Sequence, residues 1–176
     1  IRAVRYGMIT GFTMKGKFRK YLREYAPRLT EISSSRLTEE VIKILKSGKS
    51  AKIFEFLVIS GILHYLMPNM YAALKENLGF FERTRRRNKL YENLRSLDKK
   101  RQQSGELSMG ETFAAWMISL VEFPEGAERI DVDALYKDVF RKIKHLIKPI
   151  TPPNREVEQA VRKRAAVTVI RPLRRS

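Results

Sequence analysis

The stretch SSSRLTEEVIKILKSG, residues 33–48, decides the fold class of this chain. Its apolar residues recur at the spacing that places them on one face of an α-helix. They are Leu37, Val41, Ile44 and Leu45. A serine before this stripe can cap the helix, acidic side chains lie in its early turns, and Gly48 can end it. The stretch therefore predicts an amphipathic helix that packs one face against a core.

Apolar residues at the same helical spacing occur on both sides of this stretch. Upstream, IRAVRYGMITGF (residues 1–12) carries two arginines beside its apolar stripe. Downstream, SAKIFEFLVISG (residues 50–61) begins with Ser50, which we expect to cap a helix. Residues 99–108, KKRQQSGELS, have no such stripe and predict a polar loop.

The rest of the chain repeats the helical pattern. Apolar stripes of this kind run through residues 70–97, 109–121 and 132–147. No strand pattern of useful length interrupts them. The sequence therefore predicts an all-α protein, a multi-helix array of about seven to nine helices with no sheet.

The composition narrows the class of protein. Of the 176 residues, 43% are hydrophobic, which is enough to build a core, and none is cysteine, which excludes a disulfide framework and a cysteine nucleophile. No apolar run reaches the roughly 18 residues that a membrane span needs. We therefore expect no membrane partner and a cytoplasmic location.

The 36 Lys and Arg against 19 Asp and Glu give a net charge of +17, which favours nucleic acid as the partner over an acidic protein or an anionic surface.

Positive charge is concentrated in three places. Residues 15–28 hold six basic residues interleaved with Tyr21 and Tyr25, and residues 83–89 hold five with no acid. The tail from Arg155 ends in IRPLRRS. One such cluster is typical of a solvated helix face, whereas three together favour phosphate binding. The two tyrosines can stack on unpaired bases, and they can equally belong to the core.

Three patterns resemble catalytic or metal-binding motifs, and each has a simpler explanation. SGKS at residues 47–50 ends like a phosphate-binding P-loop, but Lys43 occupies the place of its first glycine. The aspartates of DVD, residues 131–133, precede a helical stripe and are typical of helix capping. His64 and His145 have no acidic or histidine partner at ligand spacing. The residues therefore predict no catalytic residue and no metal site in this chain.

IRAVRYGMITGF (residues 1–12) resembles a signature of the poly(A) polymerase and tRNA nucleotidyltransferase (CCA-adding) superfamily, roughly L-R-A-x-R-[FY]-A-x-x-x-G-F. The residues that fit are Arg2, Ala3, Arg5, Tyr6, Gly11 and Phe12, and those that depart from it are Gly7 and Met8. The similarity continues through YAPRLTEIS, SRLTEEVIKILKSG and FEFLVISGILHYLMP, and it covers residues 1–68.

MGETFAAWMISLV (residues 109–121) and the arginine-rich C-terminus resemble the bacterial poly(A) polymerase branch more than the CCA-adding branch. That resemblance implies a template-independent enzyme that adds AMP from ATP to RNA 3′ ends. It also implies an N-terminal α/β head that carries two catalytic aspartates, Mg²⁺ and ATP. This chain would begin just after the head, so we expect neither the catalytic carboxylates nor a cofactor in it.

The resemblance also implies roles for particular residues. Residues 1–68 would form the neck that binds RNA and primer, and residues 69–176 the body and the basic tail. Arg2 and Arg5 would face the head near the nucleotide. The implied partner is an RNA 3′ end, single-stranded or tRNA-like. The residues that we expect to bind it are Lys15, Lys17, Arg19, Lys20, Arg23, Arg85, Arg86, Arg87, Arg171, Arg174 and Arg175.

Two alternatives remain open from the sequence. The first is the body and tail of a tRNA CCA-adding enzyme, because nucleotide choice depends on a few residues of the head. The second is a non-enzymatic, basic helical adaptor that binds RNA or an acidic protein. Recognition of an acceptor stem by shape and 2′-hydroxyls would mark the first of these.

Overall fold

The fold is helical throughout the part of the chain that the structure describes. The computed structural model describes residues 1–12, 15–75, 80–117, 120–121 and 132–169, and within these ranges it contains no strand. The all-α class is therefore confirmed. In chain order the elements are α1 (Arg2–Thr10), α2 (Gly16–Tyr25), the 3₁₀-helix η1 (Ala26–Glu31), α3 (Ser34–Leu45), α4 (Ser50–Ile59), α5 (Ile62–Leu66), α6 (Pro68–Lys75), α7 (Phe80–Ser104), α8 (Met109–Met117), α9 (Val132–Leu146) and α10 (Asn154–Val169).

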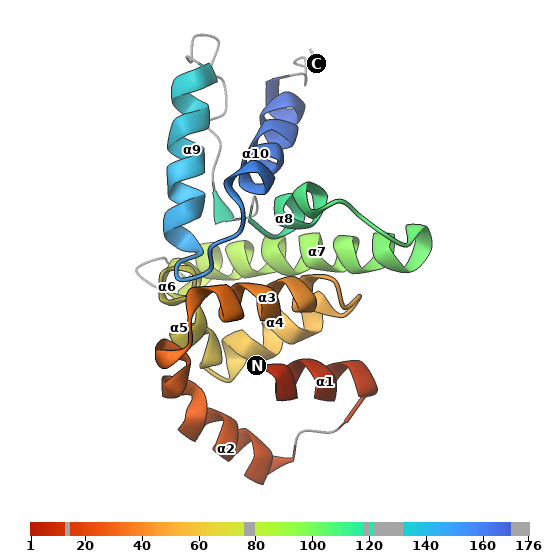
Figure 1. Cartoon of the computed structure of the whole chain (residues 1–176), viewed down its shortest axis with the longest axis vertical. Helices are drawn as coiled ribbons and strands as arrows, with labels where there is room; N and C mark the ends of the chain where they lie inside the picture. Colours follow the sequence, from red (N-terminus) through yellow and green to blue (C-terminus); the bar gives the residue numbers. More distant parts are fainter. Residues whose placement is uncertain (13–14, 76–79, 118–119, 122–131, 170–176) are drawn as a thin grey trace.

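The long helix α7 crosses the middle of the molecule, and the other helices lie on either side of it (Figure 1). On one side α4 packs against α7, and α3 and α1 pack against α4. On the other side α8 packs against α7 and α10, and α9 packs against α10. The helix α2 lies at the lower edge of the view, where it contacts η1. None of its ten residues is buried.

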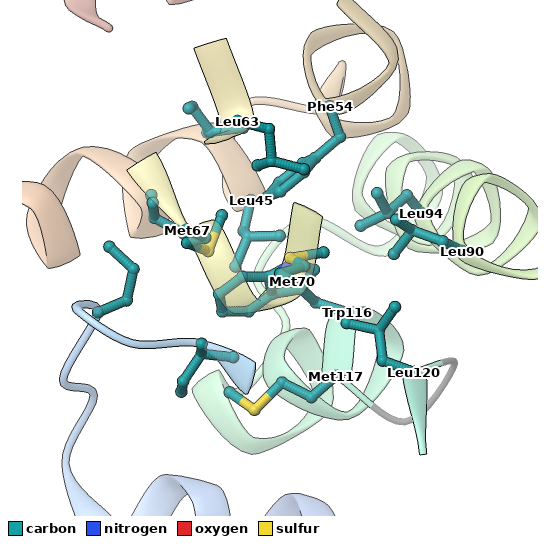
Figure 2. Close-up of a cluster of buried hydrophobic side chains, with 14 of the residues drawn as sticks. Leu45, Phe54, Leu63, Met67, Met70, Leu90, Leu94, Trp116, Met117 and Leu120 are labelled. Atoms are coloured by element: carbon teal, nitrogen blue, oxygen red, sulfur yellow. The ribbon is translucent and has the colours of Figure 1, made fainter. Parts of the chain in front are cut away.

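One continuous cluster of buried hydrophobic side chains connects these layers. Its largest side chain is Trp116 of α8, whose ring centroid lies 5.8 Å from that of Phe54 in α4 and 6.2 Å from that of Phe113. Figure 2 shows Trp116 among side chains from several helices, including Met70 and Leu94. Because α8 carries the largest buried ring, it connects α4 to the later helices.

The core does not stop at the boundary expected between residues 1–68 and 69–176. Leu45 and Phe54 belong to the first range, whereas Leu90 belongs to the second, and all three lie in the same buried cluster (Figure 2). The division into two parts stays a prediction. In the structure the two ranges share a core.

The loop predicted for residues 99–108 is wrong over its first half, because α7 continues to Ser104. Two side chains of this extension hold it in place. Arg101 Nη2 donates to Thr112 Oγ1 in α8 at 2.9 Å, and Gln102 Nε2 donates to the Gly48 carbonyl at 3.3 Å. These contacts fix the end of α7, and Lys, Arg and Gln are good helix formers, so the segment is helical although it carries no apolar stripe.

The cap predicted at Ser50 is also different in the structure. Ser50 is the first residue of α4, and the capping acceptor is Asp98 of α7. The backbone N–H and the hydroxyl of Ser50 donate to Asp98 Oδ1 at 2.9 and 2.8 Å, and the Ala51 N–H donates to Oδ2 at 3.0 Å. A carboxylate at a helix N-terminus accepts hydrogen bonds from the free N–H groups and interacts favourably with the positive end of the helix dipole. Asp98 therefore fixes α4 to α7.

The predicted number of helices is too low. The described residues contain ten α-helices and one 3₁₀-helix, where seven to nine helices were expected. Short elements account for the difference, since α5 has five residues and α6 has eight. Gly61 separates α4 from α5 with a φ of 78°, a left-handed conformation that favours glycine. A helix of five to eight residues has only one or two turns, so its apolar residues repeat too few times for the helix to be recognised from the sequence.

The helices differ in their surface character. The longest, α7, has 25 residues and a markedly polar sequence, FFERTRRRNKLYENLRSLDKKRQQS. The apolar helix α4 has ten residues. Among the helices of the described ranges, none combines the length and the hydrophobicity needed to cross a membrane.

Candidate nucleic-acid interface

Helix α1 is fixed to the body by one carboxylate. Arg5 donates to Glu40 Oε2 in α3 through Nε at 3.3 Å and Nη2 at 3.2 Å, and Arg2 donates to Oε1 through Nη2 at 3.3 Å. Arg5 is only 8% exposed, whereas the side chain of Arg2 is 71% exposed. Of the two arginines, Arg5 is thus occupied in holding α1, and Arg2 is the one that reaches the surface.

The carboxylate of Glu40 is more acidic than an ordinary glutamate. Its burial alone would raise the pKa, but hydrogen bonds from Arg5 and Arg2 and the nearby charges of Arg5 and Lys43 outweigh burial and lower the pKa below 4.5. Lys43 Nζ lies 3.7 Å from Glu40 Oε1. Glu40 is therefore ionised near neutral pH, where it compensates the buried charge of Arg5.

The C-terminal end of α1 is held by a lysine from the turn before α4. Lys49 Nζ donates to the Ile9 carbonyl at 2.9 Å and to the Met8 carbonyl at 3.4 Å. A cation suits this position because the last carbonyls of a helix are free and carry partial negative charge. Gly11 then ends the helix with a φ of 76°, and the chain leaves toward α2.

Helix α2 is amphipathic but weakly attached. Phe18 and Leu22 pack against the core from its inner face, and Phe18 also makes an edge contact with Phe12, with ring centroids 6.3 Å apart. None of the ten residues of α2, all of which the structure describes, is buried. Two side chains therefore position the whole helix, and the rest of its surface is open to solvent.

The open surface of α2 and η1 carries six cations and the single acid Glu24 within residues 15–28. All six cations are exposed, and five of them are residues that the sequence predicts to bind RNA. We call this surface, together with its two exposed tyrosines, the α2 ridge. Its residues are Lys15, Lys17, Arg19, Lys20, Tyr21, Arg23, Tyr25 and Arg28. Such a surface attracts phosphates strongly, because like charges gather on a helix with little protein around it.

The second predicted cluster, on α7, is less accessible. Arg85 is exposed, but Arg86 and Arg87 are half-buried. Arg87 Nε donates to the Leu74 carbonyl near the end of α6 at 3.3 Å, so it has a structural role. Arg85 and Arg86 also interact with other groups of the chain. This cluster therefore offers fewer available cations than the α2 ridge.

The structure does not bring the predicted clusters together. The layer of α3, α4 and α5 separates α2 from α7 (Figure 1). The tail arginines Arg171, Arg174 and Arg175 lie outside the described residues. A single continuous phosphate path along all three clusters is therefore not part of the described structure, and the role of each predicted residue stays a prediction.

The roles of two residues of this region were not predicted, although Arg28 was counted in the basic cluster of residues 15–28. Arg28 lies over the ring of Tyr25, with the guanidinium carbon 5.1 Å from the ring centroid, a cation–π geometry. Its signal in the sequence was the placement of an arginine one turn after Tyr25. Glu40 holds α1 through two arginines 38 and 35 residues away, and no local pattern reveals such a partner.

The described residues do not form a metal site. Within the described ranges no group of three or more His, Asp or Glu side chains can hold a metal ion. His64 is exposed and makes edge contacts with the rings of Tyr65 and Tyr71, at 5.0 and 5.3 Å between centroids. His145, near the end of α9, is also exposed, and its backbone carbonyl accepts a hydrogen bond from Asn69 Nδ2 of α6 at 2.9 Å. The donor set of this part of the chain therefore does not fit Mg²⁺.

Comparison with known families adds an independent finding. Residues 11–74 match the family model described as "Probable RNA and SrmB- binding site of polymerase A". The matched segment contains all of the α2 ridge and continues through α6. Neither the curated proteins nor the solved structures contained a match. The family match supports a poly(A) polymerase-related helical RNA-binding part and RNA as its partner.

Proposed function

We propose that this chain is the RNA-binding helical portion of a bacterial template-independent nucleotidyltransferase that adds AMP from ATP to RNA 3′ ends. The observation that carries the proposal is the α2 ridge, which presents six exposed cations inside the segment that matches the polymerase family. The match supplies RNA as the partner, and the ridge supplies a physical means of holding it.

The ridge would act through phosphates. Each cation that neutralises a phosphate releases a condensed counterion, so affinity falls steeply as salt rises. Phosphate contacts orient the RNA without reading its sequence. The role proposed for this surface is therefore to keep the RNA near the reaction centre through successive additions, whatever its sequence.

Nucleotide transfer itself is assigned to a head domain. The described residues do not fit Mg²⁺, so we derive no metal-dependent step through them. In this proposal Mg²⁺ and ATP bind to the head, where the metal supplies charge neutralisation for the leaving pyrophosphate. Arg2, whose side chain is exposed at the start of α1, would face that head. We propose a cytoplasmic location, which is compatible with a sequence without cysteine.

The RNA-binding part is tested by charge removal on the ridge. We would change Lys17, Lys20 and Arg23 together to Ala and measure the anisotropy of labelled oligo(A) over a salt series. If each lysine or arginine contacts one phosphate, the slope of log K against log salt falls by about 2, from about 0.7 per contact on single strands. The matched control removes three exposed cations from α9 and its end, Lys137, Arg141 and Lys148.

The α9 variant shows whether RNA binds to a site on α2 or is attracted only by the net positive charge of the protein. A loss of slope in the ridge variant alone supports the proposal. An equal loss in both variants shows that net charge alone attracts RNA, and contradicts an interface on α2.

For the catalytic part, the natural full-length protein is given an RNA primer with ATP and CTP. Tails of A alone support polyadenylation, whereas ends in CCA identify the CCA-adding alternative.

A further inference from the structure

Two large aromatic side chains of α2 are exposed without a structural reason. Tyr21 is 58% and Tyr25 is 52% exposed, although both belong to a helix that needs apolar contacts to stay attached. Phe18 and Leu22 make those contacts instead. The tyrosines are therefore not required by the core, which removes the structural explanation that the sequence left open.

Tyr21 and Tyr25 project from the same side of α2, and both are exposed. Residues four apart on a helix are neighbours, with Cβ atoms about 5–6 Å apart, so Tyr21 and Tyr25 form one row. Lys17 precedes Tyr21 by the same interval and continues the row. Arg28 covers part of the Tyr25 ring at the other end, with its guanidinium carbon 5.1 Å from the ring centroid. The row therefore has two aromatic rings in the middle and one cation at each end.

This arrangement matches the chemistry of a single strand. An unpaired base offers a flat face that stacks on a tyrosine, while the phosphate beside it needs a cation within reach. In a duplex the base faces are already stacked on their neighbours, so a protein can reach the phosphates, the 2′-hydroxyls and the base edges but not the base faces. A row of rings flanked by cations therefore distinguishes single-stranded RNA from duplex RNA, which cations alone do not.

We propose that Tyr21 and Tyr25 form a base-stacking platform on the α2 ridge that selects single-stranded RNA. This inference rests on the proposed function and specifies the class of RNA that the same surface takes. Lys17 and Arg28 hold the phosphates on either side of the stacked bases. The platform has no requirement for a particular base, because every base has an aromatic face.

The experiment separates base contacts from phosphate contacts. Using the whole chain, we would measure the affinity for three probes: a short oligo(A), an abasic strand with the same number of phosphates, and a blunt-ended RNA duplex without unpaired bases. The variants are Tyr21→Ala with Tyr25→Ala, and the same pair changed to Phe. The matched control is Tyr6→Ala on α1, which removes a ring of similar exposure, 54%, that also lies beside an arginine.

The expected result is selective. The double Ala variant binds oligo(A) at least about fivefold more weakly, the lower end of the effect of removing one stacking ring, and it binds the abasic strand as the unmodified protein does. The double Phe variant keeps its affinity, since stacking needs the ring and not the hydroxyl. Tyr6→Ala leaves all three affinities unchanged.

Other outcomes overturn the platform. An unchanged affinity of the double Ala variant for oligo(A), or an equal loss on the abasic strand or the blunt duplex, shows that the tyrosines do not stack on bases. An equal loss in Tyr6→Ala shows that the effect is not specific to α2. If the tyrosine variants give one of these results but the variant without Lys17, Lys20 and Arg23 still binds RNA more weakly, the proposed RNA-binding function is supported and only the base-stacking platform is rejected. If the unmodified protein binds no RNA probe, the proposed function itself fails.

A spectroscopic measurement reports the contact directly. Trp116 is the single tryptophan of the chain and is fully buried, so it gives a constant background. In a Tyr25→Trp variant, stacking of a base on the new indole quenches its fluorescence on addition of oligo(A). Addition of the abasic strand leaves the fluorescence unchanged if the platform is correct. Equal quenching by both probes contradicts base stacking.

Discussion

Helices α2 and α4 have the same length and opposite surroundings. Both contain ten residues, but six residues of α4 are buried and none of α2 is. The first turn of α4 is capped by the buried Asp98, whereas no described side chain caps the first turn of α2. One helix therefore belongs to the core, and the other is carried on its surface by Phe18 and Leu22.

Because of this difference, we expect substitutions in α4 to change the stability of the protein and substitutions on the surface of α2 to change its binding. Burial of apolar side chains is the main favourable contribution to folding, so substitutions in α4 act on the whole molecule. Exposed cations and rings contribute little to folding, so substitutions on α2 act on what the protein contacts. The experiments below test that separation, beginning with the largest expected effect.

The strongest test removes the cap of α4. Asp98→Ala leaves the N–H groups of Ser50 and Ala51 and the hydroxyl of Ser50 buried without an acceptor, which costs about 3 kcal/mol of unfolding free energy. Urea denaturation measures this as a lower midpoint with an unchanged slope. The RNA affinity of the molecules that remain folded does not change. Asp98→Asn is the control, since its amide keeps one acceptor oxygen and we expect a smaller loss.

If Asp98→Ala changes the urea midpoint by less than the Asn variant does, Asp98 is not the acceptor that fixes α4. If it lowers RNA affinity in proportion to stability, the separation between the two helices is wrong. The second result would mean that α2 and α4 unfold or move together.

A smaller effect is expected at the attachment of α1. Glu40→Gln removes the charge that compensates Arg5, which is 8% exposed, so it costs about 1 to 2 kcal/mol of unfolding free energy at neutral pH. The measurement is chemical denaturation of the two proteins side by side. Glu39→Gln is the matched control, because Glu39 is exposed and pairs only with Lys43 at 3.6 Å among the described ion pairs.

The same carboxylate gives this loss a defined pH dependence. The pKa of Glu40 is lower in the folded protein than its ordinary value of 4.5, so the unfolded chain binds its proton more readily. The stabilisation is therefore complete above pH 4.5 and is lost as pH falls through the lowered pKa. The difference in stability between the unmodified protein and Glu40→Gln should shrink in that acidic window. A difference that stays constant there would show that Glu40 acts by packing and not by charge.

The helical class and several helix positions were predictable because hydrophobic spacing is a local property. The stretch that contains Leu37 and Val41 forms α3 as expected, and both side chains are buried. What the sequence did not reveal was non-local. The cap of α4 comes from a residue 48 positions away, and the partner of Arg101 near the end of α7 is Thr112 of another helix.

The candidate site shows the same limit. The charge of residues 15–28 was visible in the sequence, and the structure places all six cations of that range on the surface. Charge alone did not indicate which cluster is accessible, because Arg87 has the same residue type but is bound to the Leu74 carbonyl. Nor did it show whether Tyr21 faces the core or solvent, since Phe18 and Leu22 of the same helix offer an equally apolar face.

The smallest effect on stability is expected from α2, the helix that we propose to bind RNA. Leu22→Ala shortens one of the two side chains that attach α2, but Leu22 is only partly buried, so the unfolding free energy falls by less than about 1 kcal/mol. Leu57→Ala in α4 makes the same chemical change at a fully buried position and costs about 2 to 5 kcal/mol. Amide hydrogen exchange of α2 accelerates in Leu22→Ala while that of α4 is unchanged, because α2 opens locally. Its affinity for oligo(A) falls, since an ordered ridge is needed to hold the cations and the two rings in one row. Equal stability losses at Leu22 and Leu57 would mean that α2 is as much a part of the core as α4, and the contrast between the two helices would be lost.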